Sequence, residues 1–372
     1  MRVGVPSEIK VQEHRVGLTP MAVREYVRAG HEVLVQSGAG HGIGAGDDAY
    51  TAVGARIVAT GAEVFAASDL IVKVKEPQPQ EWPMLRAGQF LFTYLHLAPD
   101  PRQAQALIDS GCIAIAYETV TDAHGGLPLL APMSEIAGRL AIEAAAFALR
   151  KPAGGVGLLL GGVPGVHPAR VVVIGGGVVG LHAARMGTGL GAEVSVLDRS
   201  VPRLRQLDEL FEGRVRTCYA DAATIDAEVF GADVVIGAVL VPGASTPKLV
   251  TRAMLAQMRR KAVLVDVAID QGGCFETSRP TTHDAPTFEV DGIVHYCVAN
   301  MPGAVPVTAS HALNHATLPF GLALAAHGEG ALAADEHLRR GLNVHRGRVT
   351  CEPVARALGL PYVSAETVLG LA

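Results

Sequence analysis

The sequence predicts an α/β protein that is built from two doubly wound domains. Short apolar runs rich in β-branched residues alternate with helical patterns in both halves of the chain, which is typical of parallel sheets. Near the middle, one such run leads directly into a glycine-rich turn and a helical pattern. The length of 372 residues agrees with two domains that each have their own core.

The composition describes a compact globular chain without a strongly charged partner. Hydrophobic residues make up 49% of the sequence and charged residues 18%, which excludes a disordered chain. The net charge of −5 is spread without a long basic run, which argues against nucleic acid and an anionic membrane surface as partners. We expect no membrane span and no signal peptide. The five cysteines are isolated and odd in number, which favours reduced thiols in the cytoplasm.

The first 130 residues contain apolar runs that predict strands, with helical patterns between them that close near glycines. The predicted strands are residues 2–5, 31–36, 70–75, 90–95 and 112–118. The clearest helical patterns are residues 21–29 and 102–110. Strands that alternate with helices imply a parallel sheet in this half of the chain.

A glycine-rich turn begins the second sheet. The segment runs in the order strand 170–174, Gly175, Gly177, Gly180, helix 181–190 and strand 192–198. A dinucleotide-binding βαβ unit of the Rossmann type requires this order. Gly175 permits the tight turn, Gly177 lets the backbone approach a pyrophosphate, and Gly180 lets the helix pack closely on the strand. The helix N-terminus offers N–H groups and a partial positive charge to the phosphates.

Asp198, at the end of the second strand of this unit, bears on the choice of dinucleotide. A carboxylate there accepts the ribose hydroxyls of NAD and repels the extra phosphate of NADP. Arg199, Arg203 and Arg205 lie close by in sequence, so NADP remains an alternative. A second interpretation of Asp198 is a helix N-cap after the strand. We predict NAD as the cofactor.

Further strands are predicted at residues 233–239, 262–268 and 293–298. Two long helical patterns connect the halves of the chain. The first is 134–150, with Ser134 as its N-cap, and the second is 310–326, with Pro319 expected to kink it. We therefore expect a discontinuous substrate domain and a continuous nucleotide domain with a cleft between them. The predicted bounds are 1–128 with 308–372 for the substrate domain, and 129–307 for the NAD-binding domain.

Polar residues end or follow the predicted strands, where open α/β sheets bind their ligands. They are Arg15, Lys75, His96 and Glu118 in the first domain, and Asp270 and Asn300, together with Leu240, in the second. One such residue would mean little. A series across two domains indicates a small polar ligand on one wall of the cleft and a dinucleotide on the other.

Each of these residues also has an interpretation without chemistry. Arg15 fits a surface turn, and Lys75 fits an edge strand. His96 fits a hydrogen-bonded core histidine, and Asp270 fits a cap on the turn that follows it. Glu118 is ambiguous, and we assign it no more than a supporting role.

Together these segments resemble NAD-dependent alanine dehydrogenase, in the alanine dehydrogenase and transhydrogenase superfamily. The matching stretches are residues 13–20, 73–77, 93–98, 130–138, 236–243, 266–273 and 297–302. They occur in order through nearly the whole chain, so the resemblance covers both predicted domains. It implies oxidation of L-alanine by NAD⁺ and water to pyruvate, ammonium and NADH, in a reversible reaction.

The resemblance also implies catalytic and substrate-binding roles. Arg15 holds the substrate carboxylate through its fork of donors. Lys75 polarises the substrate carbonyl or binds its carboxylate. His96 acts as the general acid and base, a task that suits an imidazole near neutral pH. Asp270 orients water and stabilises the cationic imine intermediate.

On the cofactor side, the family pattern points to side chains and backbone groups in the second domain. These residues are Ser134, Val178, Val179, Asp198, Arg203, Val239, Leu240, Val267, Ala268, Ile269, Asp270, Arg279, Val298, Ala299, Asn300 and Met301. With the three motif glycines they form the predicted NAD site. Several contribute only backbone groups, so their side chains are uninformative.

Two positions depart from the family pattern. Ala220 stands where relatives often carry a hydroxyl residue near the adenine, so one cofactor hydrogen bond is expected to be missing. A divalent-ion site near the second long helix would need an acid at Ala323, although His327 is present, and we therefore predict no required metal. Met133 and Met301 are candidates for the pocket of the substrate methyl group. The resemblance implies a homohexamer.

Three other functions remain as alternatives. The first is the soluble NAD-binding component of a proton-translocating transhydrogenase, which shares the fold but tends to carry Glu at the position of Asp270. The second is a saccharopine dehydrogenase, whose motifs match less of the chain. The third is an NAD-binding module without catalysis, against which the series Arg15, Lys75, His96 and Asp270 argues.

Overall fold

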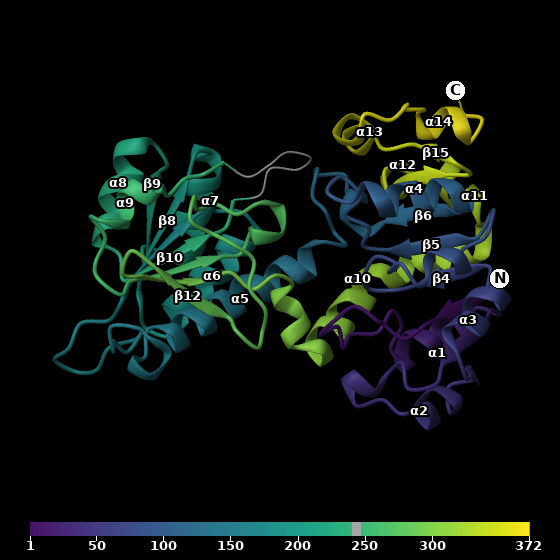
Figure 1. Ribbon diagram of the computed structural model, residues 1–372, viewed down its shortest axis with the longest axis horizontal. Coiled ribbons are helices and arrows are strands. Elements are labelled where there is room, and N and C mark those ends of the chain that lie inside the picture. Colours follow the sequence, from purple (N-terminus) through teal and green to yellow (C-terminus); the bar gives the residue numbers. More distant parts are fainter. Residues whose placement is uncertain (240–246, 372) are drawn as a thin grey trace. The chain divides into compact units, whose positions relative to one another are not determined.

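The computed structural model describes residues 1–239 and 247–371. The chain forms two compact units, each an α/β domain with its own sheet (Figure 1). Unit 1 combines Met1–Met133 with Val305–Ala372, and unit 2 is Ser134–Ala304. The α/β class predicted from the sequence is confirmed by the strand order of both sheets.

The sheet of unit 1 has the order β15-β14-β6-β5-β4-β1-β2-β3 within the described residues. Its strands are β1 (Arg2–Val5), β2 (Glu32–Gln36), β3 (Arg56–Val58), β4 (Leu70–Val72), β5 (Phe90–Thr93), β6 (Ile113–Ala116), β14 (Leu342–His345) and β15 (Arg348–Val349). Strands β1 to β6 are parallel, whereas β14 is antiparallel to β6. Because the strand order reverses between β1 and β4, the topological switch point of this sheet lies at their carboxyl ends.

The sheet of unit 2 has the order β12-β13-β11-β10-β7-β8-β9 in the part of the chain that is described. Its strands are β7 (Arg170–Ile174), β8 (Glu193–Asp198), β9 (Val215–Tyr219), β10 (Val234–Gly237), β11 (Val263–Asp266), β12 (Thr287–Val290) and β13 (Ile293–Tyr296). All are parallel except β12, which is antiparallel to β13. The switch point of this sheet lies between β7 and β10. The glycine-rich turn begins directly after β7.

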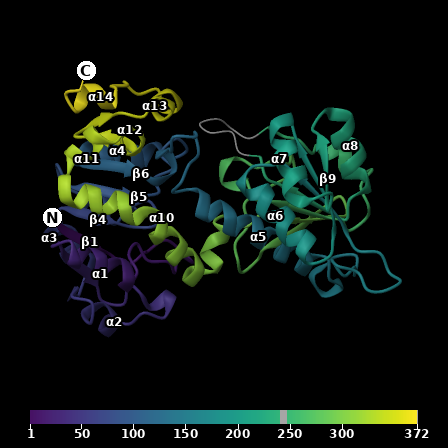
Figure 2. The same ribbon diagram turned by 180° about the vertical axis from the view of Figure 1, so that it is seen from behind.

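Helices connect these strands. Those of unit 1 are α1 (Pro20–Arg28), α2 (Asp47–Thr51), α3 (Gly61–Ala67), α4 (Pro101–Ser110), α10 (Pro306–His327), α11 (Glu329–Ala334), α12 (Glu336–Arg339), α13 (Glu352–Leu358) and α14 (Ala365–Val368). Unit 2 contains α6 (Val178–Gly189), α7 (Val201–Phe211), α8 (Ala222–Gly231) and α9 (Arg252–Leu255), and α5 (Ala131–Ala148) crosses the division. Short 3₁₀ turns include η3 (Tyr117–Thr119), η5 (Ile269–Gln271) and η6 (Met301–Ala304). Figure 2 shows α10 lying across the sheet of unit 1, where it contacts β4.

Both long helices begin earlier than the sequence predicted. The prediction that Ser134 is an N-cap is wrong, because α5 already begins at Ala131 and Ser134 is its fourth residue. Pro132 is tolerated in the first turn, where no intrahelical N–H bond is required. Helix α10 begins at Pro306 for the same reason and continues through Pro319.

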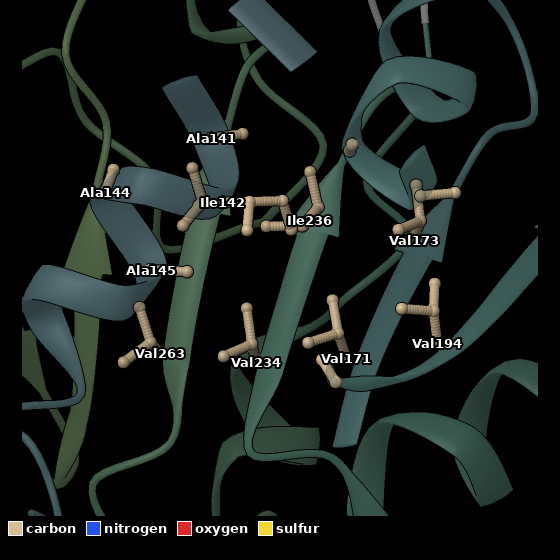
Figure 3. Close-up of a cluster of buried hydrophobic side chains, with 14 of the residues drawn as sticks. Ala141, Ile142, Ala144, Ala145, Val171, Val173, Val194, Val234, Ile236 and Val263 are labelled. Carbon is tan, nitrogen blue, oxygen red and sulfur yellow. The ribbon is translucent and has the colours of Figure 1, made fainter. Parts of the chain in front are cut away.

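The core of unit 2 explains why its central strands are apolar throughout. Alternate residues of a strand point to opposite faces of the sheet. Val171 and Val173 of β7 pack with Ala141 and Ile142 of α5 on one face (Figure 3). Val172, the residue between them, belongs to a separate buried cluster with helices α8 and α9. Helices cover both faces, so period-2 alternation disappears from the sequence.

All five cysteines are free thiols. In residues 1–239 and 247–371, no helix combines the length and the apolar character that a bilayer crossing requires.

Candidate active site

Arg15 lies in the loop after β1 and is only 2% exposed, so the interpretation as a surface turn is wrong. Its Nε donates to Glu13 Oε1 at 2.7 Å and its Nη2 donates to Glu13 Oε2 at 2.5 Å. Nη1 donates to Met133 Sδ at 3.1 Å. Burial opposes the charged form, yet the hydrogen-bonded Glu13 carboxylate raises the pKa of Arg15. Arg15 is therefore a buried guanidinium cation.

The loop that carries Arg15 is clamped between β4 and α10. A Cβ on Gly17 would lie 2.3 Å from the carbonyl oxygen of Val72, so only glycine permits this approach to the end of β4. On the other side, Val16 N–H donates to Ser310 Oγ at 3.1 Å. Asn314 Oδ1 accepts from Thr19 N–H at 2.7 Å, and its amide donates back to the Gly17 carbonyl at 3.0 Å. The backbone of Arg15 is thus fixed from two sides.

A buried ionic cluster follows β4. Lys73 Nζ is fully buried and contacts Glu8 Oε2 at 3.0 Å and Glu81 Oε1 at 2.9 Å. Burial disfavours the charged ammonium, but the two carboxylates outweigh it and raise the pKa of Lys73. Burial also raises the pKa of Glu8, although Lys73 acts in the opposite direction. Glu8 Oε1 accepts the backbone N–H of Val74 at 2.6 Å, so this cluster fixes the chain just before Lys75.

Lys75 lies beyond the end of β4, which stops at Val72, and not at the end of the strand as predicted. It is largely buried, and its carbonyl accepts from Thr93 Oγ1 at 2.9 Å. Because β4 pairs with both β1 and β5, the edge-strand interpretation of Lys75 is wrong. Although burial opposes the ionisation of Glu76, the ammonium groups of Lys75 and Lys10 lower the pKa of Glu76.

His96 follows β5 in a left-handed backbone conformation, with φ of 49°. Non-glycine residues rarely adopt this conformation, and such residues concentrate at functional sites. The side chain is 40% exposed, which excludes the interpretation as a core histidine. The Glu118 carboxylate, in η3 after β6, accepts the His96 backbone N–H at 2.6 Å and lies 3.9 Å from His96 Nδ1. Glu118 therefore anchors the strained turn that presents the imidazole.

Tyr94 directly follows β5 and lies two residues before His96. Its ring stacks on the His96 imidazole with centroids 5.8 Å apart, and its hydroxyl donates to the Leu129 carbonyl at 2.5 Å. Burial raises the pKa of Tyr94, so the phenol stays neutral. A rigid aromatic wall thus supports one side of the imidazole.

These contacts bring Arg15, Lys75 and His96 to the carboxyl ends of β1, β4 and β5, which are neighbours in the sheet. Two cations and one imidazole at a switch point are groups that can bind a small anion and exchange protons with it. A carboxylate group suits the guanidinium fork, and the lysine ammonium suits a polarised carbonyl oxygen.

In unit 2, the glycine-rich turn has the geometry of a dinucleotide cradle. Gly175 has φ of 105°, which favours glycine, and a Cβ on Gly180 would lie 1.8 Å from the Gly175 carbonyl oxygen. By contrast, no atom of the described chain lies within 4 Å of a Cβ built on Gly177, which caps α6. Val178 and Val179 form the first turn of α6. The turn therefore fits a pyrophosphate at the start of α6.

Asp198 ends β8 and organises the same turn. Its Oδ2 accepts from Gly176 N–H at 2.7 Å and its Oδ1 accepts from Ser200 N–H at 2.7 Å. The interpretation of Asp198 as a helix N-cap is wrong, because Ser200 caps α7 with its own hydroxyl. Arg203 lies in the first turn of α7, and its Nε donates to the Gly176 carbonyl oxygen at 2.6 Å. Asp198 and Arg203 thus lie next to the glycine turn, where a ribose of a bound dinucleotide is expected.

The loop after β11 carries the predicted residues Val267, Ala268, Ile269 and Asp270. It is held by Asp266, whose buried carboxylate accepts N–H bonds from Cys274 and the hydroxyl of Ser278. Burial raises the pKa of Asp266, although these donors act in the opposite direction. Main-chain bonds close the turn, from Gly272 N–H to the Ile269 carbonyl and from Gly273 N–H to the Ala268 carbonyl. The side chain of Asp270 is therefore not needed to close the turn, and Asp270 is exposed.

The other predicted cofactor residues lie at several places in unit 2. Val239 follows β10, and Leu240 lies outside the described residues. Arg279 stacks over the Phe288 ring with its Cζ 4.2 Å from the centroid. The remaining predicted residues around the end of β13 are Val298, Ala299, Asn300 and Met301, of which Asn300 has φ of 60° and Val298 and Met301 are buried.

The structure also shows where the departures from the family pattern lie. Ala220 follows β9, and its N–H donates to the Asp198 carbonyl at 3.0 Å, so this position adjoins the predicted ribose site. Ala323 and His327 both lie on α10. Among the described residues, no group of three or more His, Cys, Asp or Glu side chains is arranged to hold a metal.

Sequence reasoning missed Glu8, Glu13, Ser310 and Asn314, which hold the substrate-site loops. The alternation Glu13 and Arg15 is visible in the sequence, yet residues two apart in a loop have no fixed geometry. Ser310 and Asn314 are one helical turn apart on α10 and are buried, so the signal was a polar pair in an apolar helix. Such a pair indicates a partner but does not identify it.

Residues 4–137 match the family model described as alanine dehydrogenase/PNT, N-terminal domain, and residues 141–352 match that of the C-terminal domain. The chain is 58% identical over 371 residues to an alanine dehydrogenase of Halomonas elongata, with 100% of each chain covered. It is similar to a solved L-alanine dehydrogenase, with a TM-score of 0.93, 50% identity and coverage of 96% of this chain and 99% of that one. It is also similar to a solved transhydrogenase from Sinorhizobium meliloti, with a TM-score of 0.81, 26% identity and coverage of 94% and 100%.

Proposed function

The chain belongs to the alanine dehydrogenase/PNT family, and on that premise we propose that it is an NAD-dependent amino-acid dehydrogenase that oxidises L-alanine. The reaction is L-alanine, NAD⁺ and water to pyruvate, ammonium, NADH and a proton. The observation that carries this proposal is the set Arg15, Lys75 and His96 at three neighbouring strand ends of unit 1. The end-to-end identity with relatives named alanine dehydrogenase supports it.

In this proposal, the residues of unit 1 bind the substrate and move its protons. Arg15 binds the carboxylate through two N–H donors, and Lys75 holds the oxygen of the carbonyl or carboxylate. His96 takes a proton from the water that attacks the imine and returns it in the reverse direction. Tyr94 and Glu118 keep the imidazole in place through the ring stack and the backbone bond.

The bound NAD⁺ supplies the hydride acceptor in this reaction. The glycine turn and the start of α6 bind its pyrophosphate, and Asp198 accepts the ribose hydroxyls. Asp270 contributes a negative charge that favours the cationic imine over the neutral substrate. The protein thereby positions the reacting carbon and compensates the charge that develops on it.

The soluble component of a transhydrogenase is the second candidate, because a solved transhydrogenase shares the fold at a TM-score of 0.81. That relative is 26% identical, whereas relatives named alanine dehydrogenase are 50–58% identical over almost the full chain. Asp270, in place of the glutamate expected of transhydrogenase components, also favours the dehydrogenase.

A single assay tests the proposed function. The purified protein is mixed with NAD⁺ and L-alanine, and absorbance at the NADH band is followed. Serine, glycine, 2-aminobutyrate and the absence of amino acid serve as comparisons. NADH formation that requires alanine supports the proposal. An enzyme that binds NADH but oxidises none of the amino acids would favour the transhydrogenase candidate.

The first variant concerns cofactor choice. We expect wild-type kcat/KM for NAD⁺ to exceed that for NADP⁺ by at least ~tenfold, or about 1.4 kcal/mol, because Asp198 repels the additional phosphate. Asp198→Ser keeps a hydroxyl acceptor for the backbone and removes the charge, so the preference should narrow. The ratio of both cofactors in the same protein cancels any general loss of activity. Equal wild-type values would contradict the assignment of Asp198 to the ribose.

The second variant concerns carboxylate recognition. Arg15→Ala should raise KM for alanine and pyruvate by roughly 10- to 100-fold, which corresponds to about 1.5–3 kcal/mol for hydrogen bonds to a charged group. Arg15→Lys should recover only part of this loss, since an ammonium lacks the two-donor fork. The Arg15→Lys variant also keeps a positive charge beside the buried Glu13 carboxylate. Near-normal KM values in both variants would remove Arg15 from substrate binding.

The hexamer implied by the family resemblance belongs to the same proposal. Residues around the segment 156–166 of unit 2 support self-association, because their apolar side chains are exposed. The exposed residues are Phe147, Val156, Leu159, Val163, Val166 and Leu190. Exposed apolar side chains mark association sites on a globular protein where they form a continuous patch.

A further inference from the structure

Glu13 holds the Arg15 guanidinium by one edge. Its two carboxylate oxygens accept from Nε and Nη2 at 2.7 and 2.5 Å, and Oε1 also accepts the Arg15 backbone N–H at 3.0 Å. Both side chains are almost completely buried. Two parallel N–H···O bonds between planar groups fix the plane of the guanidinium as well as its distance. Any rotation of Arg15 would break two charged hydrogen bonds in a poorly solvated site.

Arg15 also contacts the thioether of Met133. Nη1 donates to the thioether sulfur of Met133 at 3.1 Å. A thioether is a weak acceptor, whereas a carboxylate oxygen forms a charge-assisted bond with the same N–H. The bond from Nη1 to Met133 Sδ is therefore weaker than the two bonds from Arg15 to Glu13. Met133 is the last residue of unit 1 before α5 enters unit 2, and its side chain is flexible.

We propose that Glu13 is a positioning residue that makes Arg15 a rigid receptor for one small monocarboxylate. It fixes the guanidinium through Nε and Nη2, so the orientation of Arg15 is set before a carboxylate binds to it. The inference rests on the proposed function only in identifying this carboxylate with that of alanine and pyruvate. Glu13 does not touch the reacting atoms, so its effect belongs to substrate binding and not to the chemical step.

The charge of Glu13 alone predicts the opposite effect. A carboxylate next to Arg15 repels an anionic substrate, so the loss of that charge would strengthen pyruvate binding. Loss of the fixed geometry weakens binding, because Arg15 must then be ordered by the substrate itself. The two explanations therefore predict KM changes of opposite sign for the same variant.

The test uses Glu13→Gln and Glu13→Asp in the complete protein. Glu13→Gln removes one acceptor and the charge, and Glu13→Asp keeps the charge but withdraws the carboxylate by one methylene. We expect both to raise KM for pyruvate by at least ~tenfold while kcat changes much less. Calorimetric binding of pyruvate to the NADH-loaded protein should weaken in parallel, which separates affinity from kinetics.

Glu329→Gln is the matched control. It removes a carboxylate from Arg346 in the same unit, where the Nη2 to Oε1 distance is 2.7 Å, and should leave KM unchanged. A fall in KM for Glu13→Gln would show that charge decides, and would overturn the proposal. Unchanged KM in Glu13→Asp or Glu13→Gln, even with a lower Tm, would also overturn it. A wild-type protein that neither binds pyruvate nor oxidises alanine would contradict the proposed function instead.

Discussion

Replacement of His96 by alanine is expected to lower kcat by about 10²–10⁴-fold, the usual contribution of a positioned acid–base group. The imidazole is partly exposed and is held beside Tyr94 and Glu118, so it is accessible to substrate and yet fixed. Without it, no other group is placed by this turn to exchange a proton with the attacking water. NAD binding should survive, because His96 belongs to unit 1 and the glycine turn to unit 2.

The left-handed backbone at His96 calls for a second variant. Alanine at φ of 49° adds strain of its own, whereas asparagine tolerates this region better. His96→Asn should therefore keep the native Tm and lose kcat to a similar extent. The exposed His124 provides a control, since His124→Ala should retain wild-type rates. If His96→Asn kept kcat within a few-fold of the wild type, His96 would not be the acid–base group.

Replacement of Asp270 by asparagine is expected to slow the formation of NADH from alanine by about 10²–10³-fold, the range seen when a preorganised electrostatic group is lost. Asparagine has nearly the same shape, and the turn around position 270 is closed by main-chain bonds. The folded loop should therefore persist while the anion that stabilises the cationic imine disappears. A modest loss of cofactor affinity is compatible with this role, because the same loop belongs to the predicted NAD site.

The decisive measurement for Asp270→Asn is single-turnover NADH formation with NAD⁺ saturation verified separately. Single-turnover kinetics report the chemical step and exclude product release. Hydride transfer at the wild-type rate would remove Asp270 from the mechanism.

The central strands could be predicted from the sequence because helices cover both of their faces. Strand β7 is apolar at every buried position, and the glycine turn after it is a local signal. The strands that were not predicted are β3, β9, β12, β14 and β15, which lie at or next to a sheet edge. An edge strand such as β9 is half solvated and carries polar residues, including Arg216 and Thr217, so its pattern resembles a loop.

The candidate site was predictable to the extent that strand ends mark it. Arg15, Lys75 and His96 were identified as polar residues after apolar runs, although both Lys75 and His96 lie a few residues beyond the real strand ends. The interpretations of these residues without chemistry could be rejected only from burial and strand pairing, which depend on three-dimensional neighbours. Glu13 and Glu8 carry no such mark, because a carboxylate in a loop reveals its partner only after folding.

The strand order of unit 1 has a consequence for biosynthesis. β14 pairs with β6, and Asn343 Nδ2 donates at 2.9 Å to Thr119 Oγ1, a separation of 224 residues. The ribosome synthesises all of unit 2 before β14, so one edge of β6 has no hydrogen-bonding partner from β14 until then. Nascent chains with such an edge recruit foreign strands. The sheet of unit 1 can therefore be completed only after all of unit 2 has been synthesised, whereas unit 2 is one continuous segment.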